Sequence, residues 1–483
     1  MKNFKKFLLI LIILPVMVMC SACSLIKKDP YIVNIEKSNT VDSTDTYTIT
    51  YSDGNKKYFT VENGKDGVDG DYLTLQEIEK YCEDNGISLD EFLKDYITVD
   101  SPQNQVKKAT NIAMQSAVSI FVEHPVSNST TPSVFSGSGV IYQMDDDFSY
   151  IITNYHVVHY EQSANADKIA SEIIAIQYGE DENIYSKIVS GVKDYYYGDG
   201  AVKCTYVGGS DKYDIAIIKA PTATLKANNP TVQAVDVNVS YSVSETILAV
   251  GNARGYGLSA TEGIVSVYSE EIPITDDSGA YYTNYRVMRI DAAVNGGNSG
   301  GGVFNLNGEL VGIVNAKSYS NDIDNMAYAI PCENALKVAD NIIYYHKLTG
   351  TKANPKQLIF GLTSTEKNHR QEYDKNTNTI NLYNDCVVYE NPAANTVAAA
   401  LGFKKDDIVK SVSIKRGTKT YTTILDLMHQ LEDFTLTVRA GDTLSVTVVR
   451  NGSTITLGNL ETFIIKDSNL IECDATDYKK AST

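Results

Sequence analysis

A serine surrounded by glycines is the strongest chemical feature of this sequence. It lies in the segment Asp291-Ala-Ala-Val-Asn-Gly-Gly-Asn-Ser-Gly-Gly-Gly-Val303. Glycines accept backbone conformations that other residues avoid, so the chain can turn sharply around Ser299. Such a turn presents the hydroxyl and directs backbone N–H groups to one point, where they stabilise a developing oxyanion. We assign this oxyanion hole to Gly297, Asn298 and Ser299. Taken alone, the segment also fits a flexible Gly/Asn loop.

A histidine stands at the end of an apolar run. Ser136-Gly-Ser-Gly-Val-Ile141 is followed by Ile151-Ile-Thr-Asn-Tyr-His-Val-Val158, so a predicted strand delivers His156 at its end. A general base must be neutral near pH 7 and held in one tautomer, and a histidine at a strand terminus meets both demands. A structural histidine is the alternative for this segment alone.

An aspartate opens the apolar run Asp214-Ile-Ala-Ile-Ile-Lys219. Burying a carboxylate costs free energy unless it is paired, and holding the Nδ1–H of a histidine is one pairing that compensates this cost. A strand-capping aspartate is the alternative interpretation, and Asp211 is the nearby competitor for the role.

The three segments gain weight when they are taken together. His156, Asp214 and Ser299 follow one another at steps of 58 and 85 positions. This is the chain order of chymotrypsin-like triads and differs from that of subtilisins and α/β-hydrolases. The combination predicts peptide-bond hydrolysis through an acyl-enzyme, in which Ser299 attacks, His156 transfers the proton and Asp214 orients the imidazole. No metal ion and no organic cofactor is expected.

The elements that must position these residues are mainly β. Short β-rich runs broken by Gly, Asn and Asp clusters fill residues 107–346 and predict an all-β barrel or sandwich, closed by a helix over Pro331–Tyr345. Residues 355–467 predict a second unit of β runs with one helix over Thr423–Phe434. Residues 468–483 form a polar tail.

The N-terminus has the layout of an export signal. Three lysines precede the apolar run Phe7–Met19, and the small residues Ser21 and Ala22 come directly before Cys23. The apolar run is too short for a comfortable membrane span. This layout resembles a bacterial lipobox, which implies a signal peptide over residues 1–22, a diacylated Cys23 and a lipid anchor on the extracytoplasmic face of the cell membrane. Cys20 as the modified residue, a plain signal peptide and an uncleaved anchor are the alternatives.

The segment behind the anchor divides into two parts. Residues 23–46 are polar and without periodicity, which predicts a tether. Residues 47–100 predict a small stalk module: a hairpin over 47–61 turning at Asp53-Gly54, then two helices at 75–83 and 89–96.

Composition limits the partners and the covalent chemistry. The formal net charge is −18, and removal of residues 1–22, which hold three lysines and no acids, takes it to −21. This argues against a nucleic-acid partner, because phosphate binding draws on clustered lysine and arginine. Five cysteines beyond Cys23 show no CxxC spacing and are interpreted as buried, unpaired thiols: Cys82, Cys204, Cys332, Cys386 and Cys473.

The chain resembles the HtrA (Deg) family of trypsin-like serine proteases over residues 107–346. The resemblance implies two six-stranded β-barrels with the active site between them, and oligomerisation, commonly as a trimer. Seven stretches carry it: Gly137-Ser-Gly-Val-Ile, Thr153-Asn-Tyr-His-Val-Val158, Asp214-Ile-Ala-Ile-Ile-Lys, Val250-Gly-Asn with Gly263-Ile-Val-Ser266, Gly297-Asn-Ser-Gly-Gly301, Asn307-Gly-Glu-Leu-Val-Gly-Ile313 and Ala327-Tyr-Ala-Ile-Pro331.

The same family often carries PDZ domains, and residues 355–467 resemble one. Asn391-Pro-Ala-Ala394, Ala400-Leu-Gly-Phe-Lys-Lys-Asp-Asp-Ile-Val409 and the run from Ala440 to Gly452 carry this resemblance. It implies that the loop of Ile359, Phe360, Gly361 and Leu362 receives a peptide C-terminus, while the following strand pairs with the ligand. A PDZ-like domain that only packs on the protease is the alternative.

The chain departs from the family pattern at three places. Residues 164–200 exceed what the family needs and predict an inserted loop or hairpin that gates the cleft. Gly296 stands where proline is common, which predicts a mobile oxyanion loop. Asp406-Asp407 lacks the usual glycine, so the pitch of that turn is open.

The resemblance also implies a primary specificity pocket. Ala293 stands six positions before Ser299, where enzymes that cut after lysine or arginine keep an acid. Val294, Ala316 and Lys317 are expected to line the pocket, which favours small apolar residues, although Lys317 leaves an acidic preference open.

Two functions follow from the sequence. The first is a serine endopeptidase that cuts misfolded or regulatory proteins at the bacterial cell surface. The second is a largely latent, surface-anchored peptide-binding or chaperone protein with a protease fold.

Overall fold

The computed structural model describes residues 32–41, 44–52, 54–62, 102–177, 185–189, 192–275, 282–317, 326–377 and 379–473. Two compact units, Met1–Ser101 and Pro102–Thr483, are described separately below. The signal segment, Cys23, Cys82, the helices predicted at 75–83 and 89–96 and the end of the tail lie outside the described residues. Within the described part, no helix has the length and apolar character needed to cross a membrane.

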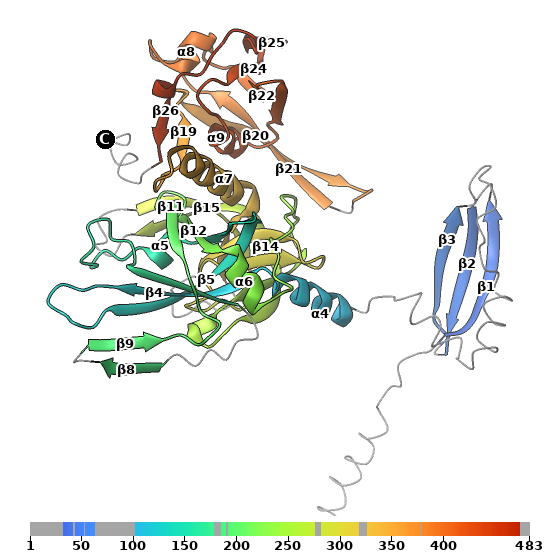
Figure 1. Ribbon diagram of the computed structural model, residues 1–483. Coiled ribbons are helices and arrows are strands. Elements are labelled where there is room, and N and C mark those ends of the chain that lie inside the picture. Colours follow the sequence, from blue (N-terminus) through green and yellow to red (C-terminus); the bar gives the residue numbers. More distant parts are fainter. Residues whose placement is uncertain are drawn as a thin grey trace, which may run out of the picture. The chain divides into compact units, whose positions relative to one another are not determined.

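The first unit contains a three-stranded antiparallel sheet (Figure 1). Its strands are β1 (Ile32–Val41), β2 (Thr44–Tyr51) and β3 (Lys56–Glu62). β2 and β3 form a hairpin in which Thr50 pairs with Lys56, and Gly54 in the turn has a φ of +82°. The tether predicted over residues 23–46 is wrong for residues 32–41, because these pair with β2 as a strand.

The second unit begins with helix α4 (Pro102–Ala113), which is followed by a seven-stranded sheet in the order β10-β7-β4-β5-β6-β12-β11. The sheet departs from the six strands expected for a first barrel by the two-residue strand β10. Its strands are β4 (Ala117–His124), β5 (Ser133–Met144), β6 (Phe148–Thr153), β7 (Glu172–Gln177), β10 (Val202–Lys203), β11 (Thr205–Ser210) and β12 (Ile215–Pro221).

The inserted segment is shorter than predicted. β7 lies within the predicted insertion 164–200, yet its residues are largely buried and it pairs with β4 along its whole length. The additional hairpin consists of β8 (Tyr185–Val189) and β9 (Val192–Tyr196), which pair with each other. Residues 164–177 therefore belong to the sheet and its approach, and the excess begins after Gln177.

Short elements then lead to a second sheet, which closes into a six-stranded barrel in the order β13-β14-β15-β18-β17-β16. The connecting elements are α6 (Thr222–Asn228) and, after β13, the short helix η1 (Ala253–Gly255). The barrel strands are β13 (Thr246–Gly251), β14 (Ser259–Thr275), β15 (Tyr282–Ile290), β16 (Gly302–Asn305), β17 (Leu310–Lys317) and β18 (Ala327–Pro331).

Each sheet buries its own apolar cluster. Ile120, Ile151 and Ile218 belong to the cluster of the first sheet, whereas Val265 and Met288 belong to that of the barrel. Runs of β-branched residues fit such doubly packed strands. The core therefore holds the ends of β6, β12 and β16 in fixed positions, and these ends lead to the residues singled out by the sequence.

Four cysteines of the described part are buried and unpaired, as predicted: Cys204, Cys332, Cys386 and Cys473. Burial raises the pKa of the thiols of Cys204, Cys386 and Cys473 to about 12. A thiol with so high a pKa carries little thiolate near pH 7, so these residues contribute packing rather than reactivity.

Helix α7 (Cys332–Thr349) follows the barrel, with Pro331 as its N-cap and Gly350 at φ +72° as its C-cap. It ends four residues after the predicted end at residue 345, because the left-handed position that ends it is supplied by Gly350. α7 packs against β11, β12 and β17 and also touches α9 (His429–Thr435), which belongs to the C-terminal domain (Figure 1).

The C-terminal domain is a five-stranded antiparallel path, β20-β21-β22-β24-β25, with β23 added on β22. β19 and β26, the first and last strands of this domain along the chain, pair with each other in a separate two-stranded sheet. Its elements are β19 (Lys356–Leu358), β20 (Ser364–Asp374), β21 (Thr379–Val388), α8 (Val397–Leu401), β22 (Ile408–Arg416), β23 (Lys419–Ile424), α9 (His429–Thr435), β24 (Thr443–Arg450), β25 (Ser453–Gly458), η2 (Asp467–Asn469) and β26 (Leu470–Glu472).

The predicted helix Thr423–Phe434 is wrong at its start. α9 begins only at His429, and residues 419–424 pair with β22 as β23. The run Thr422-Thr423-Ile424 is β-branched, which favours the extended strand over a helix.

The turn at Asp406-Asp407 is now defined. Asp406 takes the left-handed conformation, with φ +67°, that a glycine would adopt freely. Asp407 is fully buried and accepts two hydrogen bonds from the guanidinium of Arg450, at 2.6 and 2.7 Å. The bidentate pair replaces the missing glycine as the feature that fixes this turn.

Candidate active site

His156 and Asp214 are in direct contact. The short helix α5 (Tyr155–Val158) follows β6 and presents His156, while Asp214 directly precedes β12, which is the neighbour of β6. The Nδ1 of His156 lies 2.7 Å from Oδ2 of Asp214, and the backbone N–H of His156 donates to Oδ1 at 2.9 Å. The competitor Asp211 does not replace it: its electrostatic effect falls on His159.

Asp214 is held by more than the histidine. It is only 4% exposed, and Nδ2 of Asn315 donates to its Oδ2 at 2.6 Å. Its backbone carbonyl accepts a hydrogen bond from Nδ2 of Asn154 at 2.9 Å, and its φ is +48°. This carboxylate is therefore fully paired, as a buried charge requires.

Ser299 lies in the same site but is turned toward Asn315. Its Oγ donates a hydrogen bond to the carbonyl oxygen of Asn315 at 3.2 Å, and among the described residues no hydrogen bond joins it to His156. Asn315 thus contacts Asp214 through its side chain and Ser299 through its backbone, so one asparagine links these two residues.

The loop before Ser299 depends on glycine at one position and not at the next. Gly297 has a φ of +96°, and a Cβ there would lie 2.2 Å from the carbonyl oxygen of Asn252. A Cβ on Gly296 would meet nothing within 4 Å. The glycine at 297 is therefore required by backbone conformation and by space, whereas the one at 296 is not.

The hydrogen bonds of this loop orient its peptide groups. The carbonyl oxygens of Gly296, Gly297 and Ser299 accept from Arg254 N–H, Ser138 Oγ and Ser138 N–H, at 2.7, 2.7 and 2.8 Å. The N–H groups of Gly297 and Ser299 donate to no described residue. Asn298 differs, because its N–H donates to the carbonyl of Asn295 at 3.0 Å. We therefore remove Asn298 from the predicted set of anion donors.

Ser138 and Asn315 are positioning residues that the sequence analysis missed. Ser138 is fully buried, and besides the two loop contacts its Oγ accepts from Asn252 N–H at 2.7 Å and its carbonyl accepts from Thr153 Oγ1 at 2.7 Å. The one available signal was a serine between two glycines in 137–139, since a Cβ on either glycine would come within 2.8 Å of a neighbouring side chain.

The predicted pocket residues lie beside this loop, but in different environments. Ala293 is exposed, and its carbonyl accepts from Thr261 Oγ1 at 2.9 Å, whereas Val294 is 9% exposed within the barrel cluster. The backbone of Ala316 and Lys317 ends β17, next to Asn315, and their side chains lie outside the described part. The side-chain preference of the pocket stays a prediction.

The electrostatics of His156 follow from its partner. Burial lowers the pKa of the imidazole, but the charge of Asp214 and its hydrogen bond both raise it, and the net effect is a raised pKa. Burial is the largest single effect, but the charge of Asp214 and its hydrogen bond together outweigh it. Asp214 thus favours the protonated imidazole, which is what a base needs after it accepts a proton.

A second candidate site lies in the loop of residues 359–362, for which the sequence predicts carboxylate binding. The N–H of Ile359 donates to Asn469, whereas those of Phe360, Gly361 and Leu362 donate to no described residue. Gly361 has a φ of +67°, and a Cβ there would lie 2.4 Å from Thr396 Cγ2. β20, which follows the loop, is the terminal strand of its sheet, so its outer edge pairs with no described strand.

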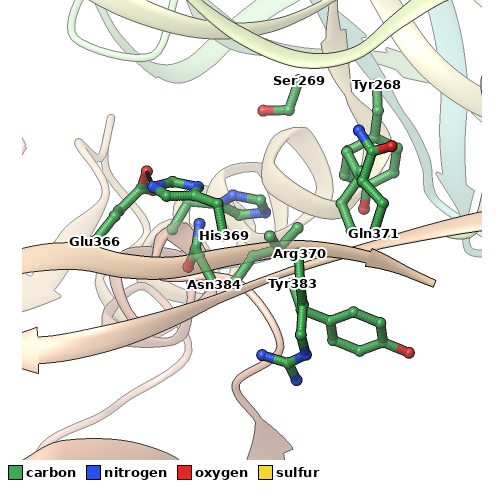
Figure 2. A pocket seen from close by; sticks show the side chains of 11 residues that line it. Tyr268, Ser269, Glu366, His369, Arg370, Gln371, Tyr383 and Asn384 are labelled. Atoms are coloured by element: carbon green, nitrogen blue, oxygen red, sulfur yellow. Dashed lines mark ion pairs between the residues drawn. The ribbon is translucent and has the colours of Figure 1, made fainter.

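A groove of about 680 Å³ opens along this strand. Figure 2 shows Tyr268 and Ser269 of β14 on one side and residues of β20 and β21, among them Glu366, His369 and Gln371, on the other. The groove is therefore bounded by the barrel as well as by the C-terminal domain.

One group of described residues has metal-ligating side chains close together: Glu333, His429 and Asp433, whose ligand atoms lie within 4.8 Å of one another. Arg286 and Lys337 already contact these carboxylates, with Arg286 hydrogen-bonded to Asp433. Burial, Arg286 and Lys337 together lower the pKa of His429 to about 3. Two cations balance the two carboxylates, so a divalent ion would gain little here, and the cluster acts as a contact between α7 and α9.

Comparisons with known proteins agree with this geometry. Residues 137–313 match the family model of the trypsin-like peptidase domain. The matched range contains His156, Asp214 and Ser299, so these residues lie within the segment that is similar to the trypsin-like peptidase domain.

Named relatives extend the similarity beyond that range. A protein described as "Serine protease HtrA-like" from Staphylococcus epidermidis is 30% identical over 338 residues, which are 66% of this chain and 51% of that protein. A "Serine protease Do-like HtrA" from Bacillus subtilis is 26% identical over 356 residues, covering 72% and 68% of the two chains. The chain spans about half the length of the first of these relatives. Over the aligned residues the chain is similar to HtrA serine proteases.

Among solved structures, "HtrA-type protease AlgW with decapeptide" is similar with a TM-score of 0.43 and 20% identity, over 73% of this chain and 96% of that one.

The contact between His156 and Asp214 predicts a measurable titration. We expect the pKa of His156 to lie above its usual 6.5, and Asp214→Asn to lower it, because the substitution removes the charge that raises it. Histidine side-chain NMR as a function of pH measures both values, with the exposed His369 as an internal control. An unchanged His156 pKa in Asp214→Asn would show that the two groups do not interact in solution.

Proposed function

We propose that this protein is a serine endopeptidase that hydrolyses internal peptide bonds through a triad of His156, Asp214 and Ser299. One observation carries the proposal. A single site contains the paired His156 and Asp214, the Ser299 hydroxyl, and two backbone N–H groups that donate to no described residue. The trypsin-like peptidase domain and the HtrA relatives support it.

Catalysis begins when the Ser299 hydroxyl turns from the Asn315 carbonyl to Nε2 of His156. His156 accepts the hydroxyl proton as Ser299 attacks the substrate carbonyl, and later donates it to the leaving amine. Asp214 is already bonded to Nδ1, which fixes the tautomer with the free lone pair on Nε2. Water then hydrolyses the acyl-enzyme with His156 again as the base.

The tetrahedral intermediate carries its negative charge on the former carbonyl oxygen. The N–H groups of Gly297 and Ser299 are the donors for this oxygen, and each contributes about 3 kcal/mol to the stability of the transition state. Their orientation is fixed beforehand by the hydrogen bonds of the loop carbonyls. Little reorganisation is therefore needed when the charge develops.

We extend the proposal to location and assembly. The lipobox-like segment ending at Cys23 supports export and a lipid anchor on the extracytoplasmic face of the bacterial cell membrane, with misfolded or regulatory proteins as substrates. The family resemblance supports a homotrimer. The negative charge of the chain argues against nucleic acid as a partner.

The C-terminal domain is proposed to bind peptide C-termini as a PDZ domain. The three N–H groups at residues 360–362, which donate to no described residue, are the hydrogen-bond donors for a carboxylate. The peptide adds as a further strand at the outer edge of β20.

One observation favours a second function, a latent peptide-binding or chaperone protein. The Ser299 hydroxyl is bonded to Asn315 rather than to His156, so this conformation is not the attacking one. Reactivity of Ser299 distinguishes the two functions.

The purified protein is expected to degrade casein, an unfolded substrate, and to react with a fluorophosphonate probe at Ser299. Ser299→Ala removes the nucleophile and should lower turnover by about a millionfold. Gel electrophoresis with mass spectrometry of the fragments measures turnover and pocket preference together. Absence of labelling in the wild type, with peptide binding retained, would support the latent protein instead.

The two adjacent glycines provide a matched test of the oxyanion hole. Gly297→Ala places a Cβ against the Asn252 carbonyl and demands a positive φ, so the loop must shift and the N–H loses its aim. We expect a fall in kcat of about 10²- to 10³-fold. Gly296→Ala meets no neighbour and should retain activity within a few fold. Equal effects of the two substitutions would contradict this geometry.

Peptide binding is tested with one pool of synthetic peptides, ending in apolar residues and made both as acids and as amides. Binding measured by fluorescence anisotropy should be about 10- to 100-fold weaker for the amides, because they lose the charge-assisted hydrogen bonds to the loop. Gly361→Ala should also weaken binding of the acids. Gly417→Ala is its control, since Gly417 shares a positive φ but has open space around it. Equal binding of acids and amides would exclude carboxylate recognition.

A further inference from the structure

Lys212 stands two positions before Asp214 and is buried. Its side chain is 7% exposed, although the residue carries a charge that strongly prefers water. The Nζ donates to the hydroxyl of the neighbouring Tyr213 at 2.8 Å and lies 4.5 Å from the centre of that ring. A lysine in this position needs further partners to offset its desolvation.

Those partners come from outside the peptidase domain. The Nζ of Lys212 donates to Oε1 of Glu432, in α9, at 3.0 Å and to Oε1 of Gln357, in β19, at 3.2 Å. The same Gln357 oxygen accepts the hydroxyl of Tyr213 at 2.9 Å. Both residues that precede Asp214 are therefore bonded to the C-terminal domain.

Strand β11, which precedes Lys212, also forms hydrogen bonds to residues outside the peptidase domain. The N–H of Ala353 donates to the carbonyl of Val207 at 3.0 Å, and Ser210 Oγ donates to the carbonyl of Cys473 at 2.9 Å. A Cβ on Gly208 would lie 1.8 Å from the carbonyl oxygen of Ala353. The linker, which is the segment between α7 and β19, therefore packs with its backbone directly against the backbone of this strand. The segment 207–213 thus lies against the linker and the end of the C-terminal domain.

Asp214 needs such support. Its φ of +48° is a conformation that non-glycine residues adopt at a cost, and it persists only where the surroundings hold it. The residues that precede Asp214 are hydrogen-bonded to the C-terminal domain, and the strand that follows it, β12, pairs with β6. One of the two anchors of the catalytic carboxylate is therefore supplied by a different domain.

We propose that Lys212 is a positioning residue through which the C-terminal domain holds Asp214 against His156. The inference rests on the proposed function and deepens it, because it makes docking of the C-terminal domain a condition for an ordered triad. Loss of the Lys212 contacts releases residues 211–214, and the carboxylate then moves away from the imidazole.

The test compares three variants of the full protein. Lys212→Met keeps the aliphatic stem and removes the charge, whereas Glu432→Gln keeps Lys212 and weakens one contact at a side chain that is half exposed. Lys410→Met is the control: it removes a lysine whose Nζ contacts Oδ1 of Asp385 at 2.6 Å, and both residues lie within the C-terminal domain, so its docking contacts are untouched.

Turnover of a short peptide substrate should show the effect in kcat and not in KM. We expect kcat to fall about 10- to 100-fold in Lys212→Met, which is the scale of a small misplacement of a catalytic group, and a few fold in Glu432→Gln. Lys410→Met should retain wild-type kcat. Wild-type kcat in Lys212→Met, or an equal loss in Lys410→Met, would overturn the proposal.

A second readout does not depend on catalysis. Asp214 is the charged group in contact with His156 and raises its pKa, so displacement of Asp214 should shift the NMR titration of His156 to lower pH in Lys212→Met and, less, in Glu432→Gln. This titration remains informative if the wild type hydrolyses no peptide, in which case the proposed function fails separately. A wild-type His156 titration in both variants would overturn the positioning role.

Discussion

The site is organised around the buried contact between the carboxylate of Asp214 and the imidazole of His156. A carboxylate that is 4% exposed must be paired on every side, and three donors reach it: the N–H and Nδ1 of His156 and Nδ2 of Asn315. These donors come from different sheets, since His156 follows β6 whereas Asn315 lies in β17 of the barrel. The desolvation of one charge thereby requires the two sheets to meet in a single arrangement.

The oxyanion loop obeys a related constraint on backbone groups. Its carbonyls at 296, 297 and 299 are bonded to Arg254 and Ser138, whereas the N–H groups of Gly297 and Ser299 donate to no described residue. An N–H group that has no acceptor in the resting enzyme can bind a newly formed negative charge without first breaking a hydrogen bond. The buried Ser138, which links this loop to the strand before His156 through Thr153, makes both halves of the site one hydrogen-bonded unit.

Much of this site could be predicted from the sequence because its chemistry has local signals: glycines beside Ser299, a histidine after an apolar run, an acid before one. Asn315 and Lys212 could not, since each acts through partners more than 100 positions away along the chain and local spacing carries no trace of such contacts. The start of α9 was missed for a different reason, because its signal is local. Thr422, Thr423 and Ile424 are β-branched, and they pair with the preceding strand β22.

The orientation of the Ser299 hydroxyl gives only weak support to the proposal of a latent protein. Its contact with the Asn315 carbonyl is a single neutral hydrogen bond of 3.2 Å, and such a bond contributes about 1 kcal/mol. Rotation toward His156 exchanges it for another hydrogen bond, so the difference is within a factor of about ten in population. Displacement of Asp214 is different in kind, because it leaves a buried carboxylate without its donors, at a cost of about 3–5 kcal/mol. The contacts that support Asp214, rather than the serine hydroxyl, are therefore the place where an inactive state would be controlled.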